Sequence, residues 1–126
     1  MFNLLLVSIG GGLGAVSRFL LGVKIQQRYP DPPIPVAMLT VNLSGSLGLG
    51  VFFGALFGGI PVLEYNNPWF LLLGVGYFGA FTTFSTFSVE AATLLHDAEY
   101  KKAFVYIGLS IAGSVAAFIA GIYWFI

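Results

Sequence analysis

The stretch of this sequence best equipped for chemistry is Thr82 to Ser88, where five of seven residues are serine or threonine. Phe81, Phe84 and Phe87 recur at every third position through the same stretch. Hydroxyl groups can replace the water around an ion, and the edge of a phenyl ring is electropositive. This combination predicts a low-affinity path for a small anion, with no fixed cation to trap it. Phenylalanines at this spacing are also typical of packing or lipid-facing residues, so the spacing alone leaves both interpretations open.

Two other stretches carry polar groups at helical spacing. Asn42 and Ser46 are four residues apart, which places an amide and a hydroxyl on one helix face. Tyr106, Ser110 and Ser114 repeat at the same interval and form one polar ladder. Either set can serve an ion, but interhelical hydrogen bonds or hydroxyls bonded to their own backbone would produce the same pattern.

Glu90 follows Thr86 by one helical turn and Thr83 by two, so its carboxylate can accept from a hydroxyl on its own face. It is therefore either a buried structural acceptor or a proton carrier. The single histidine, His96, lies beside charged residues, and the chain contains no cysteine. Disulfides, thiol chemistry and the usual zinc clusters are excluded.

The composition places these polar groups in a membrane. Of 126 residues, 58% are hydrophobic and only 8% are charged, whereas a soluble domain carries about a quarter charged residues. Five basic residues balance five acidic ones, so there is no basic surface for nucleic acid. The sequence predicts an all-α integral membrane protein that does not bind nucleic acid.

Four runs match the roughly 20 residues that a helix needs to cross a bilayer. They cover residues 2–23, 36–58, 69–95 and 103–126. All six prolines lie between these runs, where they can end helices without removing a needed donor. We therefore expect one domain, 1–126, of four transmembrane helices. Glycines at four-residue spacing, such as Gly10 and Gly14, favour close packing of these helices and an oligomer.

The third run is a poor candidate for an unbroken helix because Gly74, Gly76 and Gly79 precede its hydroxyl-rich part. We predict a break between residues 79 and 85, near the middle of this span. Unwound backbone at membrane depth occurs only where protein buries it or water reaches it, and freed carbonyls there can bind a cation. The break is therefore a candidate functional site.

Three motifs, in this order, resemble the signature stretches of the Fluc (CrcB) fluoride channel family. They are GGLGAVSR at residues 11–18, TVNLSG at 40–45 and GAFTTFSTFSVE at 79–90. The resemblance implies a non-enzymatic channel that exports fluoride passively through the plasma membrane of a bacterium or archaeon. It also implies an antiparallel, dual-topology dimer with two fluoride pores and a central structural sodium ion, and no organic cofactor.

Residue roles follow from the same resemblance. The implied fluoride path comprises Asn42, Thr83, Phe84, Ser85, Thr86, Phe87, Tyr106, Ser110 and Ser114. Glu90 belongs to the neighbouring polar face, and Arg18 lies toward an aqueous vestibule. The backbone carbonyls of Gly79 and Thr82, two from each subunit, bind the sodium. Ala80 stands where many relatives have a second glycine, but a carbonyl site depends on the break more than on that side chain.

The partners implied are fluoride, the lipid bilayer and a second subunit. Lys24, Arg28, Lys101 and Lys102 all belong to the first and third connections, and the opposite side has no lysine or arginine. A dual-topology protein should show almost no such bias, so the count favours a fixed orientation and a heterodimer with an oppositely oriented paralogue. The full set of Asn42 and both phenylalanines instead favours an antiparallel homodimer, which we take as the leading interpretation.

Two other functions compete with a channel. A small multidrug-type, proton-coupled transporter is also a four-helix antiparallel dimer, but its exchanging carboxylate is ordinarily in the first helix, whereas Glu90 is in the third. A non-transporting membrane scaffold would need the polar residues only for packing. That function does not account for the density of hydroxyl groups around the predicted break.

Overall fold

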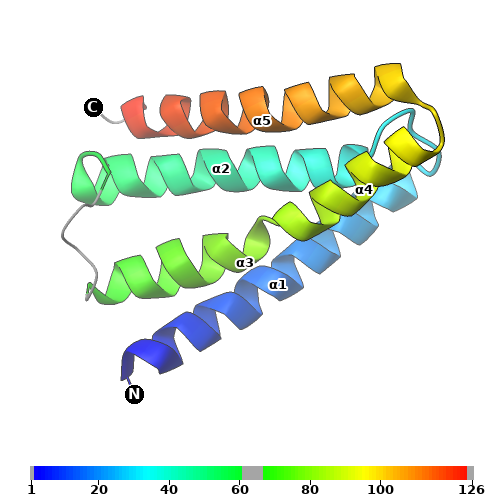
Figure 1. Cartoon of the computed structure of the whole chain (residues 1–126). Coiled ribbons are helices and arrows are strands. Elements are labelled where there is room, and N and C mark those ends of the chain that lie inside the picture. The colour runs from blue at the N-terminus through cyan, green and yellow to red at the C-terminus, as the bar shows by residue number, and fades with distance from the viewer. Residues whose placement is uncertain (1, 61–66, 125–126) are drawn as a thin grey trace.

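The chain folds as an all-helical membrane protein in the computed structural model, which describes residues 2–60 and 67–124. Four segments are long and apolar enough to cross a bilayer. They are Phe2–Arg28, Val36–Phe57, Phe70–His96 and Tyr100–Tyr123. Both termini lie at one end of the bundle, and the first and third connections lie at the other (Figure 1). The predicted all-α, four-span class is confirmed; Pro61 and the last two residues of the fourth predicted span lie outside the described residues.

Helix boundaries follow the local chemistry of the chain. Helix α1 (Phe2–Arg28) continues past Val23, the predicted end, because its polar last turns can be solvated and the first proline comes only at residue 30. Helix α2 (Val36–Phe57) begins directly after Pro35 and ends where Gly58 adopts the left-handed conformation, with φ of 72°. Helix α5 (Tyr100–Tyr123) begins one turn before the predicted start, so both lysines of the third connection are helical.

The third span consists of three consecutive helical pieces. A π-helix, η1 (Phe70–Phe78), leads into the short α3 (Gly79–Phe81), and α4 (Phe84–His96) follows. Thr82 and Thr83 between them are extended, with φ/ψ of −80°/157° and −146°/119°. The break predicted for residues 79–85 is therefore present. The π-helix was not predicted, because i→i+5 pairing has no clear sequence signal.

Glycines bring the first helix and the third span into backbone contact. A Cβ added to Gly10 would overlap the Leu72 carbonyl oxygen, and one added to Gly14 would overlap the Tyr77 carbonyl oxygen. From the other side, a Cβ on Gly76 would lie 2.9 Å from the carbonyl oxygen of Val7. Small residues thus allow α1 to pack directly on the η1 backbone and hold the segment that precedes the break.

A second glycine contact joins α2 to α5. Cβ atoms on Gly50 and Gly54 would overlap the carbonyl oxygens of Phe118 and Ile122, and one on Gly121 would meet the α2 backbone at Leu47. Helix α2 contacts α5 most extensively, while α1 contacts mainly η1. These two helix pairs, α2 with α5 and α1 with the third span, leave the break facing α2. The functional residues therefore come from α2, the break and α5.

The α1–η1 contact predicts unequal effects for two neighbouring glycine substitutions. Gly14→Ala should lower the free energy of unfolding by about 1 to 3 kcal/mol, because the new methyl group overlaps backbone that cannot rotate away. Gly12→Ala is the matched control, since nothing in the described chain lies within 4 Å of its added Cβ. Titration of each purified variant with denaturing detergent measures the difference. Equal stability of the two variants would contradict this account of the contact.

Candidate functional site

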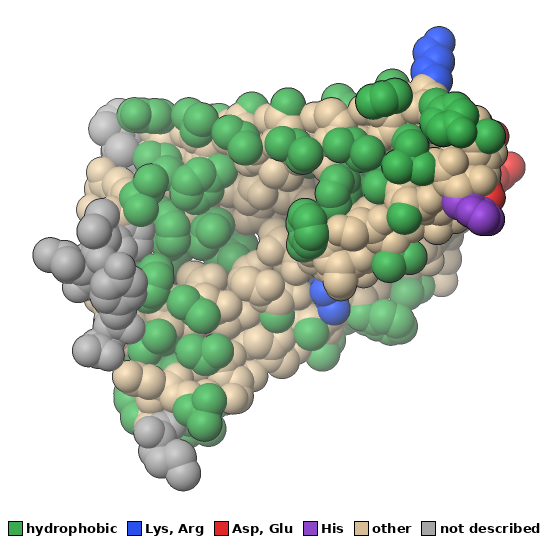
Figure 2. Space-filling model, in the orientation of Figure 1, with side chains coloured by type: hydrophobic (Ala, Val, Ile, Leu, Met, Phe, Trp, Pro, Cys, Tyr) green, Lys and Arg blue, Asp and Glu red, His purple; other side chains and the backbone are tan. Residues whose placement is uncertain are grey.

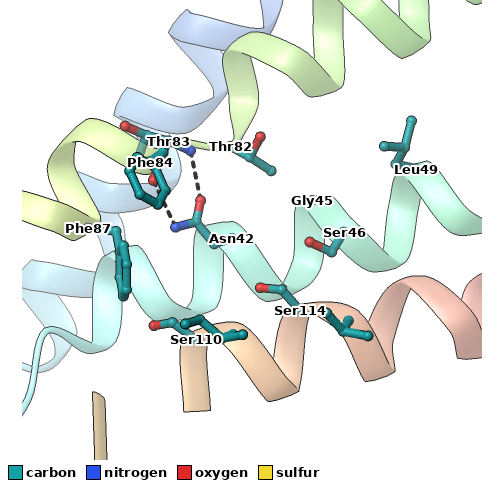
Figure 3. A pocket seen from close by; sticks show the side chains of 12 residues that line it. Asn42, Gly45, Ser46, Leu49, Thr82, Thr83, Phe84, Phe87, Ser110 and Ser114 are labelled. Atoms are coloured by element: carbon teal, nitrogen blue, oxygen red, sulfur yellow. Dashed lines mark hydrogen bonds between the residues drawn. The ribbon is translucent and has the colours of Figure 1, made fainter. Parts of the chain in front are cut away.

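The break in the third span is held by one side chain from α2. Asn42 accepts a hydrogen bond from the Thr83 backbone N–H through Oδ1 at 2.8 Å and donates from Nδ2 to the Thr83 carbonyl at 3.0 Å (Figure 3). The amide thereby pairs with both backbone groups of one extended residue, as a neighbouring strand would. Gly45, one turn along α2, permits this approach, because a Cβ there would collide with Thr82 and Phe81. We call this two-bond contact the Asn42 clamp.

The clamp changes the partners of the surrounding backbone. In an uninterrupted α-helix the N–H of Thr83 would donate to the carbonyl of Gly79, but here it donates to Asn42. Similarly, the N–H of Thr86 would donate to the Thr82 carbonyl, but it donates to the Thr83 hydroxyl at 3.3 Å. Gly79 and Thr82 therefore both lose their helical donors. These are the two carbonyls that the family resemblance implies as sodium ligands.

The break also brings two helix ends of opposite polarity together. Helix α3 ends at Phe81 with its carbonyls toward the break, and α4 begins at Phe84 with its first amides there. Carbonyl ends favour a cation, and amide ends favour an anion. One interruption of a membrane helix thus provides local polarity of both signs without a charged side chain.

Beside the break lies a pocket of about 350 Å³ between α2, α4 and α5. It is lined by Asn42, Gly45, Ser46, Leu49, Thr82, Thr83, Phe84, Phe87, Ser110, Ile111, Ser114 and Val115. None of these residues is charged. The rings of Phe84 and Phe87 lie with their centroids 5.7 Å apart, tilted by 49°. The pocket therefore combines an aromatic wall with hydroxyl and amide groups, near the middle of the third span.

Only part of the polar ladder on α5 lines this pocket. Ser110 and Ser114 line it (Figure 3), and Ser110 is buried with its Oγ lacking a hydrogen-bond partner in the described structure. Tyr106, one turn before Ser110, is fully buried, its ring centroid lies 5.4 Å from that of Phe87, and its hydroxyl faces the Glu90 carboxylate. An unpartnered buried hydroxyl costs about 1 to 3 kcal/mol, so that of Ser110 is suited to a bound ion or water.

Some predicted site residues lie outside the pocket. Ser85 and Thr86 are exposed, and the hydroxyl of each lies 3.3 Å from that of Thr83, forming a small network at the start of α4. Glu90 borders a second cavity, of about 420 Å³, beneath the proline-rich first connection, and its carboxylate faces the Tyr106 hydroxyl on α5. Arg18 is half-buried on α1 and does not line either cavity.

The phenylalanine repeat is also divided by the break. Phe81 is buried and stacked on Tyr77, with centroids 5.9 Å apart, whereas Phe84 is 79% exposed. Leu49, Ile111 and Val115 were not among the predicted site residues, and the Asn42 clamp was not predicted either. The apolar residues carry no distinguishing signal, and the clamp requires the relative placement of two helices.

The fold and the site define a multi-pass membrane protein with an uncharged pocket of aromatic, aliphatic, hydroxyl and amide groups beside a broken helix, an architecture of membrane transport proteins. Residues 5–122 match the family model described as CrcB-like protein, Camphor Resistance (CrcB). The chain therefore belongs to the CrcB-like family, and the resemblance stated from the motifs is confirmed.

Relatives in this family are named as channels. The chain is 54% identical to the fluoride-specific ion channel FluC 1 of Halalkalibacterium halodurans, over 96% of this chain and 95% of that protein. It is 39% identical to a FluC 1 of Carboxydothermus hydrogenoformans, over 98% and 93% of the two chains. It is 42% identical to FluC of a Caulobacter species, over 97% and 93%. The chain thus belongs to a family of fluoride-specific ion channels, which is not an enzyme family.

The Asn42 clamp predicts that Asn42→Leu destabilises the break. This variant keeps similar volume but removes both hydrogen bonds to Thr83, so the free energy of unfolding should fall by about 1 to 3 kcal/mol. Hydrogen exchange of the amides from residue 82 to 86 should accelerate at the same time. Ser46→Ala, which alters the same pocket one turn along α2, is the control and should leave exchange unchanged. Unaltered exchange in Asn42→Leu would show that the clamp does not hold the break.

Proposed function

We propose that this chain conducts fluoride passively and selectively through the plasma membrane of a microbe, removing fluoride from the cytoplasm down its gradient. The proposal rests on the family and on one observation in the pocket. The unpartnered Ser110 hydroxyl lies in the same pocket as the Phe84 and Phe87 rings. A small anion that leaves water needs such donors, because bare burial of charge is very costly.

The chemistry of the pocket suits conduction rather than tight binding. The phenyl edges and hydroxyl groups offer only partial positive charge to an anion. The start of α4 adds a weak positive end without a lysine or arginine. The binding free energy of an ion in this pocket is therefore large enough for the ion to enter and small enough for it to leave, as conduction requires. In this proposal Asn42, Phe84, Phe87, Ser110 and Ser114 form the path.

The remaining predicted residues take supporting roles in the same proposal. Thr83, Ser85 and Thr86 extend the hydroxyl face at the start of α4, Tyr106 continues the path below Phe87, and Glu90 lies beyond Tyr106. Arg18 attracts anions at an aqueous vestibule. Two oppositely oriented subunits cover each other's pocket, which yields two paths for each dimer.

A central sodium ion completes the proposed dimer. The carbonyls of Gly79 and Thr82 fit such an ion, because both have lost their helical donors and oxygen atoms are the ligands that hard cations prefer. Two carbonyls from each subunit would hold the ion where the two breaks meet. Its positive charge would link the subunits and hold the unwound segments in place.

Fluoride efflux from liposomes tests the aromatic wall. Phe84→Leu and Phe87→Leu keep most of the volume but remove the phenyl edge, so flux should fall about two- to tenfold while the protein still folds. Phe104→Leu is the matched control, because Phe104 is 74% exposed on α5 and does not line the pocket. Each variant is compared at equal amounts of correctly folded protein.

Unimpaired flux in both pocket variants would place the anion path elsewhere.

The same assay distinguishes a channel from a proton-coupled transporter. Channel flux should persist without a proton gradient and in Glu90→Gln. Flux that is strictly tied to protons and abolished by Glu90→Gln would instead support the transporter.

Removal of sodium tests the cation site. The melting temperature of the purified protein should rise with sodium concentration and fall when N-methylglucamine replaces sodium, because a bound ion stabilises only the folded state. Asn42→Leu should weaken this dependence by allowing Thr83 to pair again with Gly79, whereas Ser46→Ala should retain it. A melting temperature independent of sodium in the unaltered protein would contradict the site.

A further inference from the structure

The cavity of about 420 Å³ beneath the first connection lies at the end of the bundle where the first and third connections meet (Figure 1). Its walls come from the last turns of α1, the proline-rich first connection, the first turn of α2 and the second half of α4. It shares no lining residue with the pocket beside the break. Charged side chains gather toward this end on the face shown in Figure 2, so this end of the bundle meets water. We call this space the Glu90 cavity.

Glu90 is the only charged residue that lines this cavity. Among the described residues the one ion pair joins Lys102 to Glu99, so Glu90 has no basic side chain within salt-bridge distance. Its carboxylate faces the Tyr106 hydroxyl, which can donate one hydrogen bond, whereas a carboxylate can accept about four. An acidic side chain within a membrane span is costly unless a cation is paired with it. The Glu90 carboxylate therefore needs a counter-charge that the described chain does not supply.

The polar groups of the cavity do not suit a metal ion. Hard cations such as calcium take about six to eight oxygen ligands. Besides Glu90, the only polar side chains in the lining are those of Gln26 and Tyr29. A cation that brings its own hydrogen-bond donors, rather than one that needs many oxygen ligands, fits this set.

The rest of the lining suits the carbon body of an organic cation. Four prolines form part of it, and Ile25, Ile34 and Leu94 add aliphatic surface. Sites for small organic ligands have this size and character, with mostly apolar walls and a few polar groups that fix orientation. The Tyr29 ring also has an affinity for cations, since the Arg28 guanidinium carbon lies 6.0 Å from its centroid.

We propose that the Glu90 cavity binds an organic ammonium ion. The ammonium group pairs with the Glu90 carboxylate and donates hydrogen bonds to it, and the carbon body lies against the prolines and aliphatic side chains. Tyr106 is fully buried between Glu90 and Phe87, which it contacts through its ring. The bound cation is thereby separated from the pocket beside the break, and its binding does not depend on fluoride conduction.

Calorimetric titration of the purified protein with benzylammonium tests the site. Binding should saturate at one ammonium ion for each chain, after subtraction of a titration into detergent alone. Benzyl alcohol, which has the same ring but no charge, should bind roughly tenfold more weakly or less, because hydrogen bonds to charged groups are the stronger ones. Equal affinity for the two compounds would overturn the proposal.

Two variants locate the binding. Glu90→Gln keeps nearly the same shape and should weaken benzylammonium binding roughly tenfold or more. Glu99→Gln is the matched control, because Glu99 is exposed and does not line the cavity, and its affinity should equal that of the unaltered chain. Leu94→Trp retains Glu90 but fills the cavity, so it should also remove binding. Unchanged affinity in both Glu90→Gln and Leu94→Trp would contradict this location.

The ammonium group can come from a free amine or from the ethanolamine headgroup of a lipid, and nanodiscs distinguish these sources. Phosphatidylethanolamine in one preparation is replaced by a neutral galactolipid in the other, with a constant fraction of phosphatidylglycerol. A lipid ligand should compete, so the apparent affinity for benzylammonium should be at least severalfold lower with phosphatidylethanolamine in the unaltered chain. A free amine as the ligand gives equal affinity in the two membranes. Absence of saturable binding in both would overturn the site.

Discussion

The structure depends on one constraint, which is that every backbone polar group at membrane depth needs a partner other than lipid. Three spans meet it with continuous helices, but the third does not, because Thr82 and Thr83 are extended. The Asn42 amide resolves the conflict by bonding both backbone groups of Thr83. The same bonds remove the helical donor of Gly79, so the clamp that makes the break tolerable also frees the Gly79 carbonyl from its helical hydrogen bond. Stability and the candidate cation site thus have a common origin.

The glycine contacts fix the separation of the backbones that the Asn42 clamp joins. Backbone contact of α1 with η1 at Gly10 and Gly14 leaves little freedom for the segment before the break, and Gly45 lets α2 approach it closely. A side chain as short as asparagine reaches across only if the two backbones stay at this separation. Close packing in a membrane relies on small residues, since there is no hydrophobic driving force between helices in lipid. The abundance of glycine in this chain is therefore tied to the geometry of the site as well as to packing.

The two sides of the break suit ions of opposite charge. The side toward α3 ends in carbonyls, and the side toward α4 begins with amides, a buried Thr83 hydroxyl and the exposed ring of Phe84. A cation on the first side and an anion on the second would be separated by the width of a few residues and would attract each other. In the proposed function, this arrangement would stabilise an anion without a basic side chain in its path, which would hold it too tightly for conduction.

Much of this protein follows from its sequence. Long apolar runs fix the four spans because the hydrocarbon thickness sets helix length, and prolines and glycines mark where helices end or break. Spacing also placed Asn42 and Ser46 on one face, and both line the pocket. Only the tertiary structure decided which residues of the α5 ladder reach the pocket: Ser110 and Ser114 line it, and Tyr106 does not. It also placed Phe81 in the core and left Phe84 exposed, and it paired Asn42 with Thr83. Periodicity assigns a residue to a face of its own helix, but the identity of the facing group depends on how two helices, distant in sequence, are placed against each other.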